Sequence, residues 1–199
     1  MTSVEAFAAY LELARGDVGL SAATSPDAFA AICAPLGPSW ARAFYLQHAA
    51  PGGENSPCTT VALQRIARAL AAAGSPALQQ PLDGTGATGL LARHGALAKA
   101  HGAYRTAVDP GPGLRVGCVV HAEDAHGRHT RCLVERAGPA WRTVDGTLED
   151  GWGVVRAAET VYEPGLVDRA ASSKPVLFWI DVPAFLASLL GQPADGAVA

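Results

Sequence analysis

The pattern of apolar residues in the first half of the chain predicts helices. In residues 4–15 the apolar side chains recur every three or four positions, which places them on one face of a helix. Ser25-Pro26-Asp27 and Pro38-Ser39 each have the composition of a helix start, so we expect two further helices there. A polar, glycine-rich loop over residues 49–57 then leads to a fourth helix.

The fourth helix is predicted over residues 58–70. Its surface divides into an apolar stripe of Leu63, Ile66 and Leu70 and a polar stripe of Gln64, Arg65 and Arg68. We expect the polar stripe to face solvent. Pro57 fixes the start because proline cannot occupy a helix interior, and Gly74-Ser75-Pro76 supplies the stop. A glycine-rich loop over residues 82–88 and a short helix over residues 89–100 are expected to follow.

From residue 109 onward the pattern changes to strands separated by turns. The predicted strands are rich in β-branched and aromatic residues and cover residues 116–121, 129–135, 141–147, 153–155 and 176–180. Gly138-Pro139 lies between the second and third of them and predicts a hairpin turn, and residues 183–190 predict a closing helix. Helices followed by strands indicate an α+β fold, with a helical N-terminal half packed on an antiparallel sheet of about five or six strands.

We expect the 199 residues to form a single domain, because a chain of this length with 49% hydrophobic residues can bury one sizeable core. Its expected parts are a helical lead-in (1–50), the fourth helix with its loops (51–108), the antiparallel sheet (109–182) and the closing helix with a tail (183–199).

Charge and composition exclude several classes of partner. The net charge is −3, and the fifteen Lys and Arg residues form no basic run, which argues against nucleic acid or an anionic membrane as the main partner.

Glu5, Glu12 and Arg15 interrupt the first helix, so we expect neither a Sec signal peptide nor a membrane span. The default compartment is the cytoplasm, with export by a non-Sec route left open. The four cysteines have no regular spacing and are expected to be reduced.

Cys58 is a candidate nucleophile because it lies at the predicted start of the fourth helix. Unpaired N–H groups and the positive end of the helix dipole stabilise a thiolate there, and can lower a cysteine pKa from ~8.5 to about 3.5–7.5. The alternative is a small core residue, since free cysteines are among the most buried residue types.

A cysteine nucleophile needs a base and a group that orients the base. His129 is the best candidate for the base, because its backbone is anchored at the start of a predicted strand. Asp145 lies on the next strand, far from the Gly138-Pro139 turn. If the hairpin closes normally, Asp145 comes beside His129, where it can hold the ring N–H.

Four segments of the chain together resemble the motifs of a known group of enzymes. They are Ser56-Pro57-Cys58-Thr59, residues 112–120 beginning Pro112-Gly113, residues 128–134 beginning Arg128-His129, and Thr143-Val144-Asp145-Gly146-Thr147. In order and spacing they are similar to the NlpC-type and CHAP-type cysteine peptidases and amidases, which have a papain-like fold and cleave peptidoglycan. The resemblance covers residues 58–146.

The resemblance implies Cys58 as nucleophile, His129 as base and Asp145 as the orienting residue, with no cofactor. The implied substrate is a peptide-type amide in a peptidoglycan stem peptide or a related cell-wall amide. Leu114 stands where the family has Asp, and Thr147 where Asn is frequent. A first alternative is therefore a catalytically inactive papain-like domain that binds a peptide or a partner protein.

A second alternative is a structural zinc domain. Its candidate ligands, all within one predicted hairpin, are Cys118, His121, His126, His129 and Cys132. With a turn near Ala125, Cys118 is expected to face Cys132 and His121 to face His129. That register sends the cysteines to one face and the histidines to the other, so one tetrahedral site could not use all four. If the register differs, His121 and His126 become alternative candidates for the base in place of His129. The oligomeric state is not predicted.

Overall fold

The computed structural model describes residues 1–33, 57–75, 86–124, 127–162, 167–168 and 174–192. The helices in these ranges are α1 (Ser3–Gly16), α2 (Pro26–Cys33), α4 (Pro57–Ala72), α5 (Gly86–Ala100) and α6 (Val182–Leu189). The strands are β1 (Tyr104–Arg105), β2 (Val119–Asp124), β3 (Gly127–Ala137), β4 (Ala140–Glu149), β5 (Trp152–Thr160), β6 (Val167–Asp168) and β7 (Lys174–Ile180).

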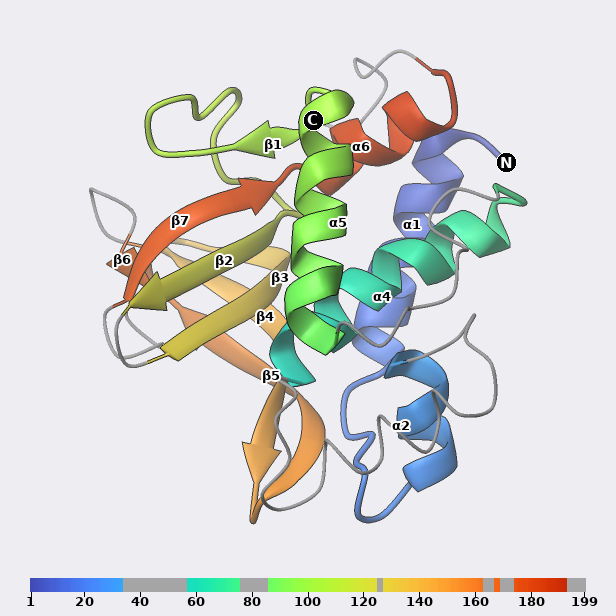
Figure 1. Ribbon diagram of the computed structural model, residues 1–199, viewed down its shortest axis with the longest axis vertical. Coiled ribbons are helices and arrows are strands. Elements are labelled where there is room, and N and C mark those ends of the chain that lie inside the picture. The colour runs from blue at the N-terminus through green and yellow to red at the C-terminus, as the bar shows by residue number, and fades with distance from the viewer. Residues whose placement is uncertain (34–56, 76–85, 125–126, 163–166, 169–173, 193–199) are drawn as a thin grey trace.

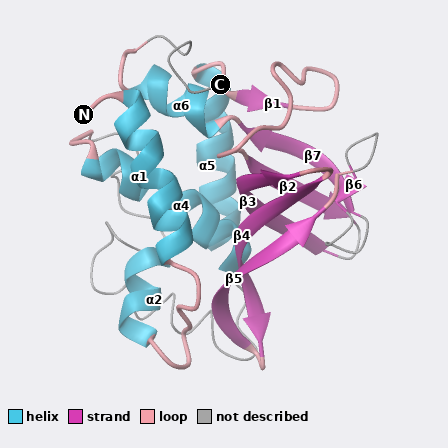
Figure 2. Cartoon of the chain, turned by 180° about the vertical axis from the view of Figure 1, so that it is seen from behind, coloured by secondary structure: helices cyan, strands magenta, loops and turns pink. Residues whose placement is uncertain are grey.

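The strands form an antiparallel sheet in the order β1-β7-β2-β3-β4-β5, and the two-residue β6 pairs with β7. The helices gather on one side of the molecule and the strands on the other (Figures 1 and 2). This is the α+β arrangement that the order of apolar patterns predicts. In the described ranges, no helix is both long and apolar enough to cross a membrane.

Two predicted boundaries are wrong. The sheet begins before residue 109, because Tyr104 and Arg105 pair with the end of β7 as the edge strand β1. The predicted loop 82–88 overlaps α5, which begins at Gly86. A two-residue strand carries no periodic signal, and Gly-Ala-Thr-Gly in the first turn of α5 has the composition of a loop. The helix predicted at Pro38-Ser39 and all but the last residue of the predicted loop 49–57 lie outside the described residues.

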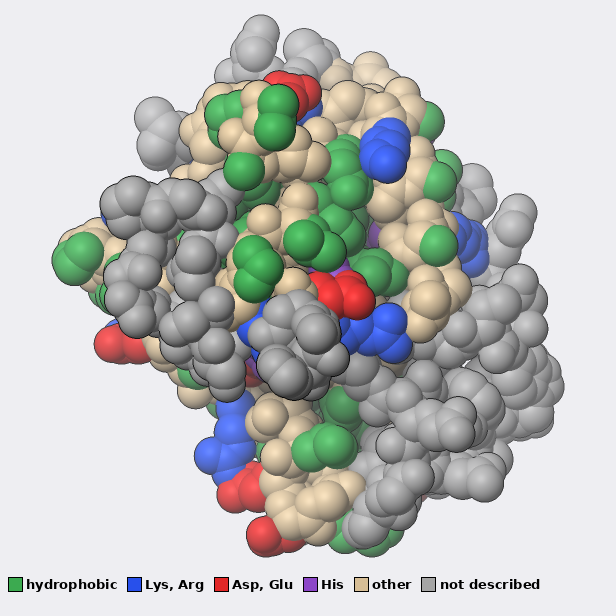
Figure 3. All heavy atoms as spheres, turned by 60° about the vertical axis from the view of Figure 1, so that its left-hand side comes forward, with side chains coloured by type: hydrophobic (Ala, Val, Ile, Leu, Met, Phe, Trp, Pro, Cys, Tyr) green, Lys and Arg blue, Asp and Glu red, His purple; other side chains and the backbone are tan. Residues whose placement is uncertain are grey.

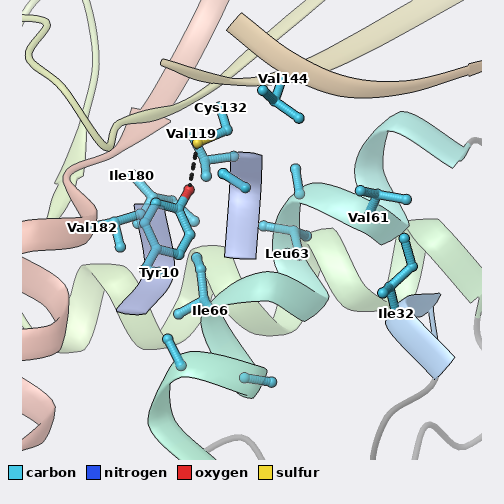
Figure 4. Close-up of a cluster of buried hydrophobic side chains, with 14 of the residues drawn as sticks. Tyr10, Ile32, Val61, Leu63, Ile66, Val119, Cys132, Val144, Ile180 and Val182 are labelled. Atoms are coloured by element: carbon cyan, nitrogen blue, oxygen red, sulfur yellow. Dashed lines mark hydrogen bonds between the residues drawn. The ribbon is translucent and has the colours of Figure 1, made fainter. Parts of the chain in front are cut away.

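Helix α4 lies at the centre of the protein, in contact with α1, α2, α5 and the strands β3 and β4. Figure 4 shows Val61, Leu63 and Ile66 of this helix in one cluster with side chains from the sheet, including Val119 and Val144. The predicted apolar stripe of α4 is therefore buried. So is most of the rest of its surface, because helices cover the sides that the sheet leaves free.

The prediction that the polar stripe of α4 faces solvent is wrong. Gln64 and Arg65 are buried, and Arg65 is 0% exposed. The charge of Arg65 is balanced by Asp17, a buried carboxylate just after α1, whose Oδ2 lies 3.3 Å from the Arg65 Nε and 2.7 Å from an Arg68 nitrogen. Ion pairing of this kind lets arginines occupy an interior from which an unpaired charge would be excluded.

The start of α4 lies directly on the backbone of β4 at Gly146. A Cβ atom at Gly146 would lie 2.4 Å from the carbonyl oxygen of Pro57 and 3.0 Å from the amide nitrogen of Cys58. Gly146 is within β4 and pairs with Val155, so it is not the turn glycine that an Asp-Gly pair suggests. Only glycine permits this approach, because any larger side chain would overlap the helix backbone.

We therefore expect Gly146→Ala to destabilise the protein by about 1–3 kcal/mol, the usual cost of overpacking against atoms that cannot move aside. Urea unfolding followed by circular dichroism measures this. Gly16→Ala is the matched control, because a Cβ at the exposed Gly16 meets no atom within 4 Å. Equal stability of the two variants would contradict the close approach of α4 and β4.

Candidate active site

Cys58 is the second residue of α4, at the end of the helix that touches β4. Pro57 opens the helix and loses no hydrogen bond there, because the first N–H groups of a helix have no partner within it. The thiol is only 3% exposed. Cys58 therefore lies among unpaired backbone N–H groups and at the positive end of a buried helix dipole, which favour a thiolate over a thiol.

His129 and Asp145 meet across the hairpin of β3 and β4. The Nε2 atom of His129 is hydrogen-bonded to the Oδ2 atom of Asp145. The same ring is also hydrogen-bonded to Cys58. Because Asp145 occupies Nε2, Nδ1 is the ring nitrogen left for the sulfur. The structure thus brings together the three residues that sequence reasoning selected, in the order Cys58, His129, Asp145.

A bulge in β3 places Asp145 on the same face of the sheet as His129. Near the turn, Ala137 pairs with Ala140 and Glu135 with Arg142, but beyond it Leu133 pairs with Thr143. One extra residue therefore lies in β3 between Leu133 and Glu135. Without it, alternation of side chains would put Asp145 opposite Cys132, on the other face from His129. The two residues do meet, as expected, but a regular hairpin would not bring them together; the bulge does.

The contacts of His129 favour its protonated form. Burial lowers the pKa of His129, but its hydrogen bonds to Asp145 and Cys58 outweigh burial and raise the pKa to about 9. At neutral pH the ring is then an imidazolium, placed between a carboxylate and a sulfur atom. An imidazolium in this position favours the thiolate form of a neighbouring cysteine over the thiol.

Arg131 is a part of the site that the sequence reasoning missed. It lies two residues after His129 in β3, and its Nη1 atom is 3.7 Å from the Asp145 Oδ2 atom. The same nitrogen donates to the Thr143 hydroxyl at 3.4 Å. The i, i+2 spacing in a strand was the available signal, because it puts Arg131 on the face of His129. Its charge fixes the carboxylate that orients the ring.

The other three cysteines have environments that favour the neutral thiol. Burial raises the pKa of Cys118 to about 12, and burial also raises the pKa values of Cys33 and Cys132. All four cysteines are buried, so exposure does not separate them. What sets Cys58 apart is its hydrogen bond to a protonated histidine.

The expected register of the β2–β3 hairpin is off by one residue. Val119, and not Cys118, pairs with Cys132, and His121 pairs with Thr130. Cys118 and Cys132 therefore lie on opposite faces, and so do His121 and His129. Among the residues described, no group of three or more His, Cys, Asp or Glu side chains could hold a metal ion. His126 lies outside the described residues.

Charged side chains lie at the end of the β2–β3 hairpin and elsewhere on the surface. Figure 3 shows acidic and basic side chains side by side near the centre of one face, with histidine atoms between hydrophobic ones. Glu123 at the end of β2 is about half exposed, and Arg128 in β3 donates to the Thr88 hydroxyl of α5 at 2.9 Å. Both carry their charge at the end of the β2–β3 hairpin that holds His129.

Comparison with protein-family models, with curated proteins and with solved structures gave no significant match. The resemblance to the NlpC-type and CHAP-type enzymes therefore rests on the sequence motifs quoted above.

Proposed function

We propose that the protein is a cysteine hydrolase that cleaves a peptide-type amide bond through Cys58, His129 and Asp145. The observation that carries the proposal is the pair of hydrogen bonds made by one partly buried ring, to the carboxylate of Asp145 and to the sulfur of Cys58. A nucleophile, a base and a group that orients the base are the parts that amide cleavage by a cysteine requires.

In the first half of the reaction the Cys58 thiolate attacks the carbonyl carbon and forms a carbon–sulfur bond. The tetrahedral intermediate collapses as the carbon–nitrogen bond breaks, and the leaving amine takes a proton from the His129 imidazolium. N–H groups at the start of α4 donate to the oxyanion, because they have no partner within the helix.

In the second half, water cleaves the thioester. Neutral His129 takes a proton from the attacking water, and the carbon–sulfur bond breaks to release the acid and restore the thiolate and the imidazolium. Asp145 holds the ring in the tautomer that presents Nδ1 to the reaction throughout.

The order of the parts also supports a papain-like assignment of the fold. A central helix carries the nucleophile at its start, and an antiparallel sheet that follows it in sequence carries the base and the orienting acid. The motif resemblance over residues 58–146 adds the substrate class, a peptidoglycan stem peptide or a related cell-wall amide.

Iodoacetamide should alkylate Cys58 rapidly and selectively at pH 6, because among the described residues this is the only thiol that faces an imidazolium. Mass spectrometry of the labelled peptides measures the rate at each cysteine. In His129→Ala we expect labelling of Cys58 to be about a hundredfold slower at pH 6, since a thiol with an ordinary pKa of about 8.5 is almost wholly protonated there. Cys118, Cys33 and Cys132 serve as internal controls. If any of them reacts as fast as Cys58, the nucleophile assignment fails.

Purified protein should hydrolyse muropeptides, and Cys58→Ala should abolish the reaction. The alkaline limb of kcat/KM should fall near pH 9, because the leaving amine needs the proton that His129 loses as the pH rises through its pKa of about 9. Liquid chromatography of the released fragments measures both. A folded protein with a reactive Cys58 that cleaves neither muropeptides nor a general panel of amides would instead indicate a binding module.

A further inference from the structure

A row of hydrogen bonds leads from the surface to Cys58, independently of the triad. The Glu123 Oε2 atom lies 3.1 Å from His121 Nε2, and His121 Nδ1 lies 2.9 Å from the Thr130 hydroxyl. The Thr130 hydroxyl lies 2.9 Å from that of Thr59, and the Thr59 oxygen lies 3.8 Å from the Cys58 sulfur. We call these five residues the hydroxyl chain.

The interior of the hydroxyl chain is shielded from solvent. Thr59 and Thr130 are 0% exposed and His121 is 1% exposed, while Glu123 has about half its side chain in solvent. Each hydroxyl has one proton to donate, so a donor–acceptor order adopted at one end passes along the whole chain. The order is therefore fixed at the histidine.

When His121 is neutral, the chain runs away from the sulfur. The Glu123 carboxylate can only accept, so the single ring proton is on Nε2 and Nδ1 accepts from Thr130. The Thr130 oxygen then accepts from Thr59. Because the Thr59 hydroxyl donates its only proton to Thr130, it can only accept a hydrogen bond from Cys58. This favours the thiol form of Cys58 over the thiolate.

When His121 is protonated, the order reverses. Nδ1–H now donates to Thr130, Thr130 donates to Thr59, and Thr59 donates to Cys58. A donated hydrogen bond favours the thiolate, because hydrogen bonding to the charged form of a group stabilises that form. Both ring nitrogens of His121 are then satisfied, one by Thr130 and the other by Glu123.

We propose that Thr59 and Thr130 position the Cys58 sulfur and that the proton on His121 sets whether they donate to it. The proposal rests on the proposed function, since it concerns the nucleophile of that site. His121 is thus a positioning residue that acts through two hydroxyls, and its protonation preserves the Cys58 thiolate in acidic solution.

The pH range of the effect follows from the surroundings of His121. Burial lowers the pKa of His121 from its ordinary value, and Glu123 partly offsets this. Arg128 and His129 on β3 also lower the pKa by charge repulsion, while on β7 the neighbour is the uncharged ring of Phe178, 5.1 Å away. His121 is therefore protonated only below about pH 6.5, and the hydroxyl chain donates to the Cys58 sulfur only in that acidic range.

Thr130→Val tests the proposal, because it removes the hydroxyl that links His121 to Thr59 and leaves Cys58, His129 and Asp145 unchanged. The readout is the rate of Cys58 alkylation by iodoacetamide at pH 5 and at pH 7.5. We expect the variant to react as fast as the wild type at pH 5, where Thr59 donates to the sulfur in both proteins. At pH 7.5 it should react about fivefold faster than the wild type, because loss of the Thr130 hydroxyl frees Thr59 to donate to the sulfur.

Two further variants separate this effect from damage to the core. Thr60→Val is the matched control, since the buried Thr60 hydroxyl has no hydrogen-bond partner among the described residues, and its pH profile should match the wild type. Glu123→Gln changes only a half-exposed side chain, so the fold is kept. It should slow alkylation at pH 5 and not at pH 7.5, because loss of the carboxylate lowers the pKa of His121 further.

The outcomes are distinct. If wild-type Cys58 reacts selectively but Thr130→Val and Glu123→Gln follow its rate at both pH values, the hydroxyl chain has no role and the proposed function stands. Equal slowing of Thr130→Val at both pH values also overturns the inference, because it indicates only a disturbed core. If wild-type Cys58 shows no selective reaction, the proposed function itself fails.

Discussion

The contact between the start of α4 and the backbone of β4 is the constraint on which the candidate site depends. It exists because Gly146 has no side chain, and it seats the first turn of a buried helix against the strand that carries Asp145. In water the unpaired N–H groups of that turn would be solvated and their field screened. Held in the interior, they act on Cys58 at low dielectric, where a dipole and a charge interact more strongly.

Burial of α4 has a cost, which Asp17 offsets. The helix carries Arg65 and Arg68 into regions where an unpaired guanidinium would be unstable, and the carboxylate of Asp17 binds both. This ion pair lies on the far side of α4 from the apolar stripe, so it helps fix the helix in rotation. The position of Cys58 at its start is fixed with it.

The sequence predicts the composition of the site better than its geometry. The helix start at Pro57 and the turn at Gly138-Pro139 are local signals, and both are confirmed. The one-residue bulge in β3 has no such signal, because an extra residue in a strand is decided by packing on both faces of the sheet. Yet it is the bulge that turns Asp145 toward His129.

The lack of a local sequence signal also explains the other differences between the predicted and the observed structure. The observed register of the β2–β3 hairpin differs from the expected one by one residue, and it puts His121 on the same face as Thr130, where the hydroxyl chain forms. It also puts Cys118 and Cys132, expected on one face, on opposite faces. Amphipathic periodicity assigned Arg65 to solvent, because it cannot show that a carboxylate from another helix end will meet it. In each case, contacts with a segment distant in the sequence decide where the side chain lies.

An ion pair between Cys58 and His129 is tested most directly by the pKa of the His129 ring, measured by NMR titration of the imidazole. We expect a value of about 9 in the wild type, because hydrogen bonds to both Asp145 and Cys58 stabilise the protonated ring. In Cys58→Ala the value should fall, since the sulfur's contribution is gone. A wild-type value at or below the ordinary 6.5, unchanged by Cys58→Ala, would contradict the ion pair.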